Sequence, residues 1–133
     1  MPPKHPANRG SHKKRRFMVI DDERDIAESI CKAIELTGNA AIFYCNPVDA
    51  VAEIEKNPDD YIGIFTDLRM PHMQGEEVIR RVRQITHDIP IVIVTGTSGV
   101  FTTDDLVKLN IPVFIEKPFN ISNIEIAVTK MKK

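Results

Sequence analysis

Apolar and polar positions follow a regular order along this chain, in which a short apolar run precedes a segment of helical spacing. Apolar runs that predict β-strands lie at 15–20, 41–45, 61–66, 90–94 and 112–115. After each run, apolar residues recur every three or four positions, as on the buried face of a helix. The predicted helices lie at 26–37, 47–54, 76–85, 103–109 and 121–131. Strand and helix therefore alternate five times, which predicts an α/β domain.

The predicted strands are apolar on both faces, most clearly in the segment IPIVIV at 89–94. Such strands are typical of a parallel sheet that helices cover on both sides. Two helix boundaries carry local signals. Gly38 ends the first helix, and Asn46-Pro47 places a capping residue and a proline at the start of the second.

Composition fits one globular domain. The chain has 133 residues, of which 42% are hydrophobic and 28% are charged. No uncharged apolar run approaches the roughly 20 residues of a membrane-spanning helix. Cys31 and Cys45 have neither CxxC spacing nor zinc-finger histidines, so we expect reduced thiols and a cytoplasmic protein.

The net charge of -1 conceals an asymmetry. Residues 1–16 hold six Lys and Arg and no acid, so this segment carries +6. The remaining twelve basic and nineteen acidic residues give residues 17–133 a charge of -7. We predict a flexible basic arm over 1–16 and a folded domain over 17–133. The positive charge of the arm would allow it to bind nucleic acid or a membrane surface. Because the arm lacks aromatic residues and helical periodicity, a solvated tail is the better interpretation.

Polar side chains stand at the carboxyl ends of four predicted strands. The first strand leads to Asp21 and Asp22, the third to Asp67, the fourth to Thr95 and the fifth to Lys117. In an open parallel sheet the functional crevice lies beyond these ends. The sequence therefore predicts one cluster of three carboxylates, a hydroxyl and an ammonium.

Three crowded carboxylates repel one another unless they share a cation or a proton. Oxygen ligands without a nearby Cys or His favour a magnesium-like ion over zinc. Asp21-Asp22 is equally explained as a loop and helix-cap pair. Asp67 can be a metal ligand, a turn former or a nucleophile that accepts a phosphoryl group.

Lys117 follows an apolar strand and precedes Pro118, and an X-Pro bond at such a place can be cis. Its ammonium suits a phosphate oxygen. Taken alone, Lys117 would be an ordinary surface lysine and Thr95 an ordinary threonine at a strand end. Their joint placement is what indicates a site.

Four stretches together resemble the response-regulator receiver domains of bacterial two-component signalling, among them the chemotaxis regulator. These stretches are MVIDDE (18–23), IFTDLRMPHMQGEE (64–77), IVIVTG (91–96) and VFIEKPF (113–119). The resemblance spans nearly all of 17–133. It implies a flavodoxin-like parallel sheet of five strands in the order 2-1-3-4-5, flanked by five helices.

The resemblance also implies a role for each strand-end residue. Asp67 would accept a phosphoryl group, Lys117 would pair with it, and Thr95 would move to hydrogen-bond it. Phe114 would take the position of the switch aromatic and act by packing alone, since it has no hydroxyl.

A magnesium ion would complete this site. Asp22 and Asp67 would bind it directly, Asp21 would act mainly through a metal-bound water, and the backbone carbonyl of Arg69 would be a further ligand.

The partners that the resemblance implies are a sensor histidine kinase or a histidine phosphotransfer protein, and an output protein or fused output domain. The surface that partners read would comprise the fourth helix, the fifth strand and the fifth helix, which also allows a phosphorylation-linked dimer. The domain would be a signalling switch that catalyses only its own phosphotransfer and dephosphorylation. We expect no nucleic-acid binding and no membrane binding through this domain.

Three positions depart from the common pattern. Arg69 and Thr97 lie where the family varies the lifetime of the phosphoryl group. Gly96 stands where alanine is usual, which predicts a mobile loop after the fourth strand.

The principal alternative is a receiver-like scaffold that binds partners without phosphorylation. A phosphatase of the haloacid dehalogenase type would need an aspartate where Arg69 stands. A flavin-binding flavodoxin would need a hydroxyl-rich first loop instead of Asp21-Asp22-Glu23. The chain has no Walker A or GxGxxG motif for a nucleotide.

Overall fold

A computed structural model describes residues 15–96 and 101–132 of the chain. Five parallel strands form one sheet in the order β2-β1-β3-β4-β5. The strands are β1 (Arg16–Ile20), β2 (Ala40–Tyr44), β3 (Tyr61–Thr66), β4 (Ile91–Thr95) and β5 (Val113–Glu116). The predicted α/β architecture and strand order are confirmed.

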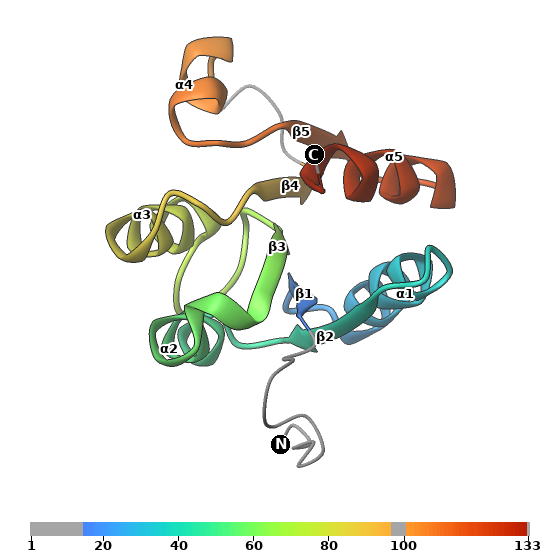
Figure 1. Cartoon of the computed structure of the whole chain (residues 1–133), viewed down its shortest axis with the longest axis horizontal. Helices are drawn as coiled ribbons and strands as arrows, with labels where there is room; N and C mark the ends of the chain where they lie inside the picture. The colour runs from blue at the N-terminus through green and yellow to red at the C-terminus, as the bar shows by residue number, and fades with distance from the viewer. Residues whose placement is uncertain (1–14, 97–100, 133) are drawn as a thin grey trace.

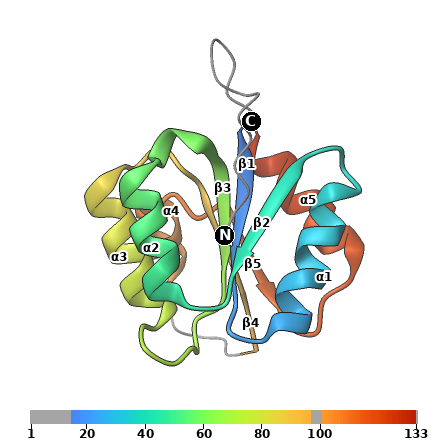
Figure 2. The same cartoon turned by 90° about the horizontal axis from the view of Figure 1, so that it is seen from below.

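Helices cover both faces of the sheet. Figure 1 shows α2, α3 and α4 on one side and α1 and α5 on the other, and Figure 2 shows the same layers with the strands running up and down between them. The helices are α1 (Arg24–Glu35), α2 (Pro47–Lys56), α3 (Gly75–Ile85), α4 (Thr103–Lys108) and α5 (Ile121–Met131), with a 3-10 turn η2 (Pro58–Asp60). No helix of the described segments is long and apolar enough to cross a membrane.

Alternate residues of each strand belong to different cores, because successive side chains of a strand point to opposite faces. In β1, Met18 and Ile20 pack under α2 and α3, whereas Phe17 and Val19 pack under α1 and α5. All four side chains are 1% exposed or less. This double burial explains why the strands have no polar face.

Three strands, β1, β4 and β5, begin one residue later than the sequence predicts, and in β4 and β5 the residue left out is a proline. Pro90 and Pro112 precede β4 and β5 instead of starting them. Proline has no backbone N–H to donate to the ladder, which explains both shifts. The carbonyl of Pro90 still accepts a hydrogen bond from the amide of Ile64, at 3.0 Å.

The arm predicted over 1–16 falls mostly outside the described residues, as does the loop at 97–100. Arg15 and Arg16 are the two residues of the predicted arm that the structure describes, and Arg16 is the first residue of β1. Arg15 donates hydrogen bonds to the carbonyls of Asp59 and Tyr61, at 3.2 and 2.9 Å.

The predicted cap of the second helix is confirmed. The Asn46 side chain accepts a hydrogen bond from the amide of Val48 at 2.9 Å, and Pro47 is the first residue of α2. We expect Asn46→Ala to lower the free energy of unfolding by about 1 kcal/mol, because one helix-end amide loses its acceptor. Urea denaturation measures this loss. Asn46→Asp keeps the acceptor and serves as the control; equal stability of the Ala and Asp variants would contradict the role of the cap.

Candidate functional site

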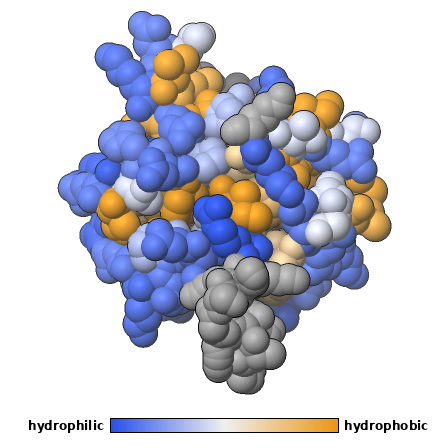
Figure 3. All heavy atoms as spheres, viewed as in Figure 1, coloured by the Kyte–Doolittle hydropathy of each residue, from blue (hydrophilic) through white to orange (hydrophobic). Residues whose placement is uncertain are grey.

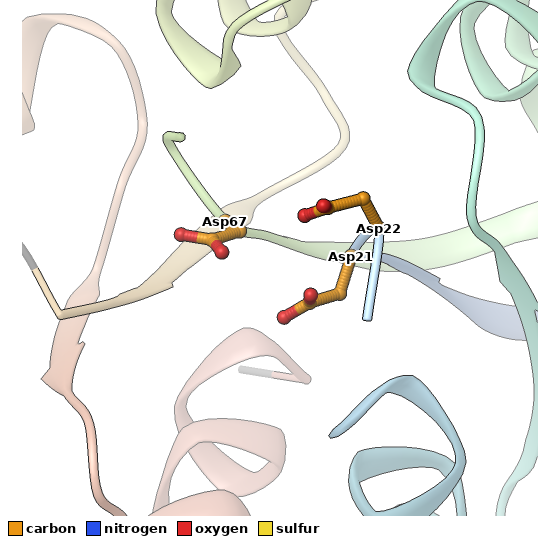
Figure 4. Close-up of side chains that lie close together, drawn as sticks. All are labelled: Asp21, Asp22 and Asp67. Atoms are coloured by element: carbon orange, nitrogen blue, oxygen red, sulfur yellow. The ribbon is translucent and has the colours of Figure 1, made fainter. Parts of the chain in front are cut away.

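Three carboxylates meet at the carboxyl ends of two neighbouring strands. Asp21 and Asp22 follow β1, and Asp67 follows β3, which pairs with β1 so that Ile20 lies opposite Thr66. One carboxylate oxygen of each residue lies within 4.8 Å of the others. Figure 4 shows the three side chains close together, with the carboxylates of Asp21 and Asp22 on the side that faces Asp67. The predicted convergence of Asp21, Asp22 and Asp67 is therefore present in the structure.

Lys117 joins two of these carboxylates. Its Nζ donates to Asp21 Oδ2 at 2.9 Å and to Asp67 Oδ2 at 3.0 Å. The Lys117 backbone amide also donates to the Thr95 carbonyl at 2.9 Å, and the Lys117–Pro118 peptide bond is cis. A residue that follows β5 thus reaches across the end of β4 to the acidic cluster.

Backbone groups hold the two buried carboxylates. Asp67 Oδ1 accepts from the Leu68 amide at 2.6 Å, and Asp21 Oδ1 accepts from the Glu23 amide at 2.9 Å. The Asp67 amide in turn donates to the Ile20 carbonyl at 3.0 Å. Each carboxylate therefore has one oxygen on the backbone and the other on Lys117.

Burial and charge oppose each other in this cluster. Asp21 is 1% exposed, and burial raises its pKa, although the hydrogen bonds from Glu23 and Lys117 offset part of this. Burial lowers the pKa of Lys117, but its hydrogen bonds to Asp21 and Asp67 outweigh burial, so the pKa is raised. The lysine is thus held as the cation of the site.

Thr95 and Phe114 lie on neighbouring strands and differ in how deeply they are buried. Thr95 ends β4 and is 1% exposed. Phe114 lies in β5 opposite Ile93 and is half-buried against the core under α4. Phe114 also lines a surface groove of about 660 Å³, together with Phe101 and Ile126. The two predicted switch residues therefore lie on adjacent strands, one near the carboxylates and one at the groove.

Arg69 lies on the loop after Asp67 with an exposed side chain, whose Nη1 donates to Gln74 Oε1 at 2.7 Å. Asp22 is exposed as well, so the cluster is open to solvent on that side. The donor set consists of carboxylate oxygens with a neighbouring backbone segment, which fits a hard cation such as Mg²⁺. Asp22, Asp67 and, through water, Asp21 are the residues that would hold it.

Comparison with known proteins assigns the family. The family model for the response regulator receiver domain matches residues 17–129. The chain belongs to this family. Receiver domains of response regulators act in two-component signalling, and the resemblance carried by the four sequence stretches is thereby confirmed.

Curated relatives of this receiver domain are response regulators. It is 26% identical over 117 residues to the response regulator receiver protein CpdR of Brucella abortus, covering 88% of this chain and 96% of CpdR. It is 32% identical over 102 residues to the transcriptional regulatory protein FixJ of Rhizobium meliloti, covering 76% of this chain and 48% of FixJ. The domain thus spans nearly all of one relative and about half of the other.

Solved structures show the same fold. A receiver domain from Clostridium thermocellum matches with a TM-score of 0.79 at 23% identity, covering 89% of this chain and 94% of that one. The structure of FixJ-N matches with a TM-score of 0.73 at 27% identity, covering 89% and 93%.

Two residues have structural roles that the sequence analysis did not predict, Gly75 and Arg83. Gly75 opens α3, and a Cβ there would lie 2.3 Å from the Asp67 carbonyl oxygen. Arg83 is buried in α3, although arginine is usually exposed. A signal for Arg83 was present, since it follows Ile79 by four residues and so shares the buried face of the helix. Gly75 lies in the stretch 64–77 just before the predicted third helix, but no residue pattern indicates its constraint, which comes from a close approach to Asp67 in space.

We expect Gly75→Ala to lower the free energy of unfolding by about 1–3 kcal/mol, because the added methyl meets backbone atoms of Asp67 and Leu68 that cannot rotate away. Urea denaturation tests this. Gly96→Ala is the matched control, since a Cβ at Gly96 meets no atom within 4 Å. Equal loss in both variants would show that the close approach at Asp67 does not decide the effect.

The raised pKa of Asp21 has a consequence for stability in the absence of divalent cations. The folded protein holds this proton more tightly than the unfolded chain, so ionisation of Asp21 destabilises the folded state as pH rises above the ordinary value of 3.8. We therefore expect Asp21→Asn to gain stability relative to the unsubstituted protein between acidic and neutral pH. Urea denaturation across this range measures the difference.

The control for this experiment is Asp59→Asn, since Asp59 is an exposed carboxylate in η2 far from the cluster in sequence. A stability difference for Asp21→Asn that stays constant with pH, or that falls as pH rises, would contradict the prediction.

Proposed function

We propose that this receiver domain accepts a phosphoryl group on Asp67 from the phosphohistidine of a sensor histidine kinase or a phosphotransfer protein. The single observation that supports this most directly is the position of Asp67 Oδ2, 3.0 Å from the Lys117 ammonium and beside the carboxylates of Asp21 and Asp22. A carboxylate at that point has a cation ready for the oxygens of an incoming phosphoryl group.

In the transfer, an oxygen of the Asp67 carboxylate forms a bond to phosphorus, and the bond from phosphorus to the histidine nitrogen breaks. The imidazole takes up that electron pair and leaves, and Asp67 becomes an acyl phosphate. Bound Mg²⁺ would supply charge neutralisation for the phosphoryl oxygens. Lys117 then pairs with a phosphoryl oxygen in place of Asp67 Oδ2, so it remains paired throughout.

The three carboxylates would share the metal unequally. Asp22 is exposed and therefore available as a direct ligand with Asp67. Asp21 is 1% exposed and so lies deeper than Asp67, which is 7% exposed. This supports a role for Asp21 through a metal-bound water. The Arg69 carbonyl, two residues after Asp67, is the proposed backbone ligand.

The switch would act through Thr95 and Phe114. A phosphoryl group on Asp67 is bulkier and more negative than the carboxylate, so it attracts the Thr95 hydroxyl. Phe114 then packs into the space that Thr95 leaves. Because Phe114 lines the groove bounded by Phe101 and Ile126, this movement alters the α4-β5-α5 surface that an output partner reads.

The lifetime of the acyl phosphate is proposed to depend on Arg69. Its hydrogen bond to Gln74 holds the guanidinium within the segment between β3 and α3, which begins with Asp67. Thr97, the other position expected to set this lifetime, lies outside the described residues.

We infer an output partner that is either a separate protein or a fused domain. FixJ and the C4-dicarboxylate transport transcriptional regulatory protein DctD of Rhizobium meliloti are both longer than this chain, which spans 48% and 22% of them. Cytoplasmic location and a phosphorylation-linked dimer through α4-β5-α5 belong to the same proposal. The domain would act as a switch and catalyse only its own phosphotransfer and dephosphorylation.

Incubation with acetyl phosphate and Mg²⁺ tests the proposal. We expect intact mass to show one added phosphoryl group that is lost on hydroxylamine treatment, as an acyl phosphate is. Asp67→Asn should abolish the adduct, and chelation of Mg²⁺ should prevent it. Lys117→Met should slow its formation at least tenfold, because the positive partner of the phosphoryl oxygens is removed.

Asp88→Asn is the matched control, since Asp88 is an exposed aspartate on the loop before β4. It should accept the phosphoryl group as the unsubstituted protein does. An unsubstituted protein that gains no adduct, or an adduct that survives in Asp67→Asn, would favour the alternative of a scaffold that binds partners without phosphorylation.

A further inference from the structure

Arg83 is a buried cation whose hydrogen bonds, among the residues that the structure describes, all go to backbone carbonyls. Its guanidinium donates to the carbonyls of Leu109 at 2.7 Å and Asn110 at 3.2 Å, which follow α4. It also donates to the carbonyls of Thr86 at 3.1 Å and Ile89 at 2.8 Å, which lie between α3 and β4. One side chain of α3 therefore ties the end of α4 to the loop before β4.

Arg83 remains charged in this position. Burial lowers its pKa to about 10, which is still far above neutral pH. Hydrogen bonds from a cation to neutral carbonyls are stronger than those between neutral groups. The planar guanidinium also suits carbonyls on two sides of it, which a lysine ammonium could satisfy only in part.

Helix α4 is packed less deeply than the other helices, through the partly buried side chains of Leu106 and, at its carboxyl end, Leu109. None of its residues is fully buried, and Val107 is 74% exposed. Figure 3 shows hydrophobic residues among hydrophilic ones at the surface over α4. Elements with few buried apolar contacts open at low free-energy cost. The polar contacts at its ends therefore matter more for α4 than for the other helices.

The two ends of α4 are held differently. At the amino end, within the part of the chain that the structure describes, the hydrogen bonds are those by which Thr102 and Asp105 cap each other, so they move with the helix, and the contact to the core is the apolar packing of Phe101. At the carboxyl end, the bonds join α4 to other elements. Besides the Arg83 contacts, the Asn110 carbonyl accepts from the amide of Ile91, the first residue of β4.

From this asymmetry we propose that Arg83 is a positioning residue that fixes the carboxyl end of α4 as a pivot. Motion of the helix then takes the form of rotation about Leu109–Asn110, with the amino end moving. This inference rests on the proposed function. A movement of Thr95, at the other end of β4 from Ile91, then reaches the α4-β5-α5 surface as a movement of the amino end of α4.

Amide hydrogen exchange of the full chain, followed residue by residue by NMR, tests the pivot. The Leu106 amide bonds to the Thr102 carbonyl within the amino-terminal turn, and the Leu109 amide bonds to the Asp105 carbonyl. In the unsubstituted protein we expect Leu109 to exchange at least tenfold more slowly than Leu106. In Arg83→Met the two rates should converge, with Leu109 exchanging at least tenfold faster than before.

Two further variants make the result specific. Arg83→Lys should fall between the unsubstituted protein and Arg83→Met, because lysine restores charge but not all four hydrogen bonds. Arg81→Met is the matched control on the same helix, since Arg81 is exposed and pairs with Glu77. A merely structural Arg83 would raise exchange at both amides, and in β1 and β3, by one common factor.

Addition of acetyl phosphate and Mg²⁺ completes the test. We expect exchange at Leu106 to change at least threefold, while Leu109 stays within twofold. An unaltered ratio of the two rates in Arg83→Met, or equal change at both amides on phosphorylation, would overturn the pivot. Intact mass separates this result from the proposed function. A protein without a phosphoryl adduct would refute that function, while the rates in the unmodified protein would still decide whether Arg83 fixes the helix.

Discussion

The site depends on one interaction, the pairing of the Lys117 ammonium with the buried carboxylates of Asp21 and Asp67. Two carboxylates removed from water at this short separation repel each other and lose hydration. A cation that contacts both, at 2.9 and 3.0 Å, offsets these costs without a bound ion. The same lysine is a ready partner for added negative charge, which is the role that we propose for it during phosphoryl transfer to Asp67.

The parallel sheet makes this pairing possible. Its order brings the ends of β1 and β3 side by side and leaves β4 between β3 and β5. Lys117 therefore reaches the carboxylates over the end of the strand that carries Thr95, and its amide bonds to the Thr95 carbonyl. A change of charge at Asp67 therefore acts directly on Lys117, which also contacts Asp21 after β1 and the Thr95 carbonyl in β4.

At the opposite end of the same sheet, the cation that joins separate segments is an arginine, Arg83. Lys117 is a compact charge that faces carboxylates, whereas Arg83 spreads its charge over four carbonyls of two loops. Arg83 is a buried cation and Lys117 a partly buried one, and each joins segments far apart in the sequence. β4 connects them, with Ile91 bonded to the loop that Arg83 holds and Thr95 bonded to Lys117. The strand therefore has one end beside the loop that Arg83 holds and the other beside the carboxylate cluster.

The sequence by itself determined the five strand–helix cycles, the cap at Asn46 and the strand-end positions of Asp21, Asp67 and Lys117. These follow from periodicity and local chemistry, which act over a few residues. Tertiary structure alone decided which oxygen faces Lys117, why Gly75 admits no side chain, and where the Arg83 guanidinium finds its acceptors. Those features depend on separations of tenths of an ångström between segments distant in the chain, and no pattern of residue types encodes such distances.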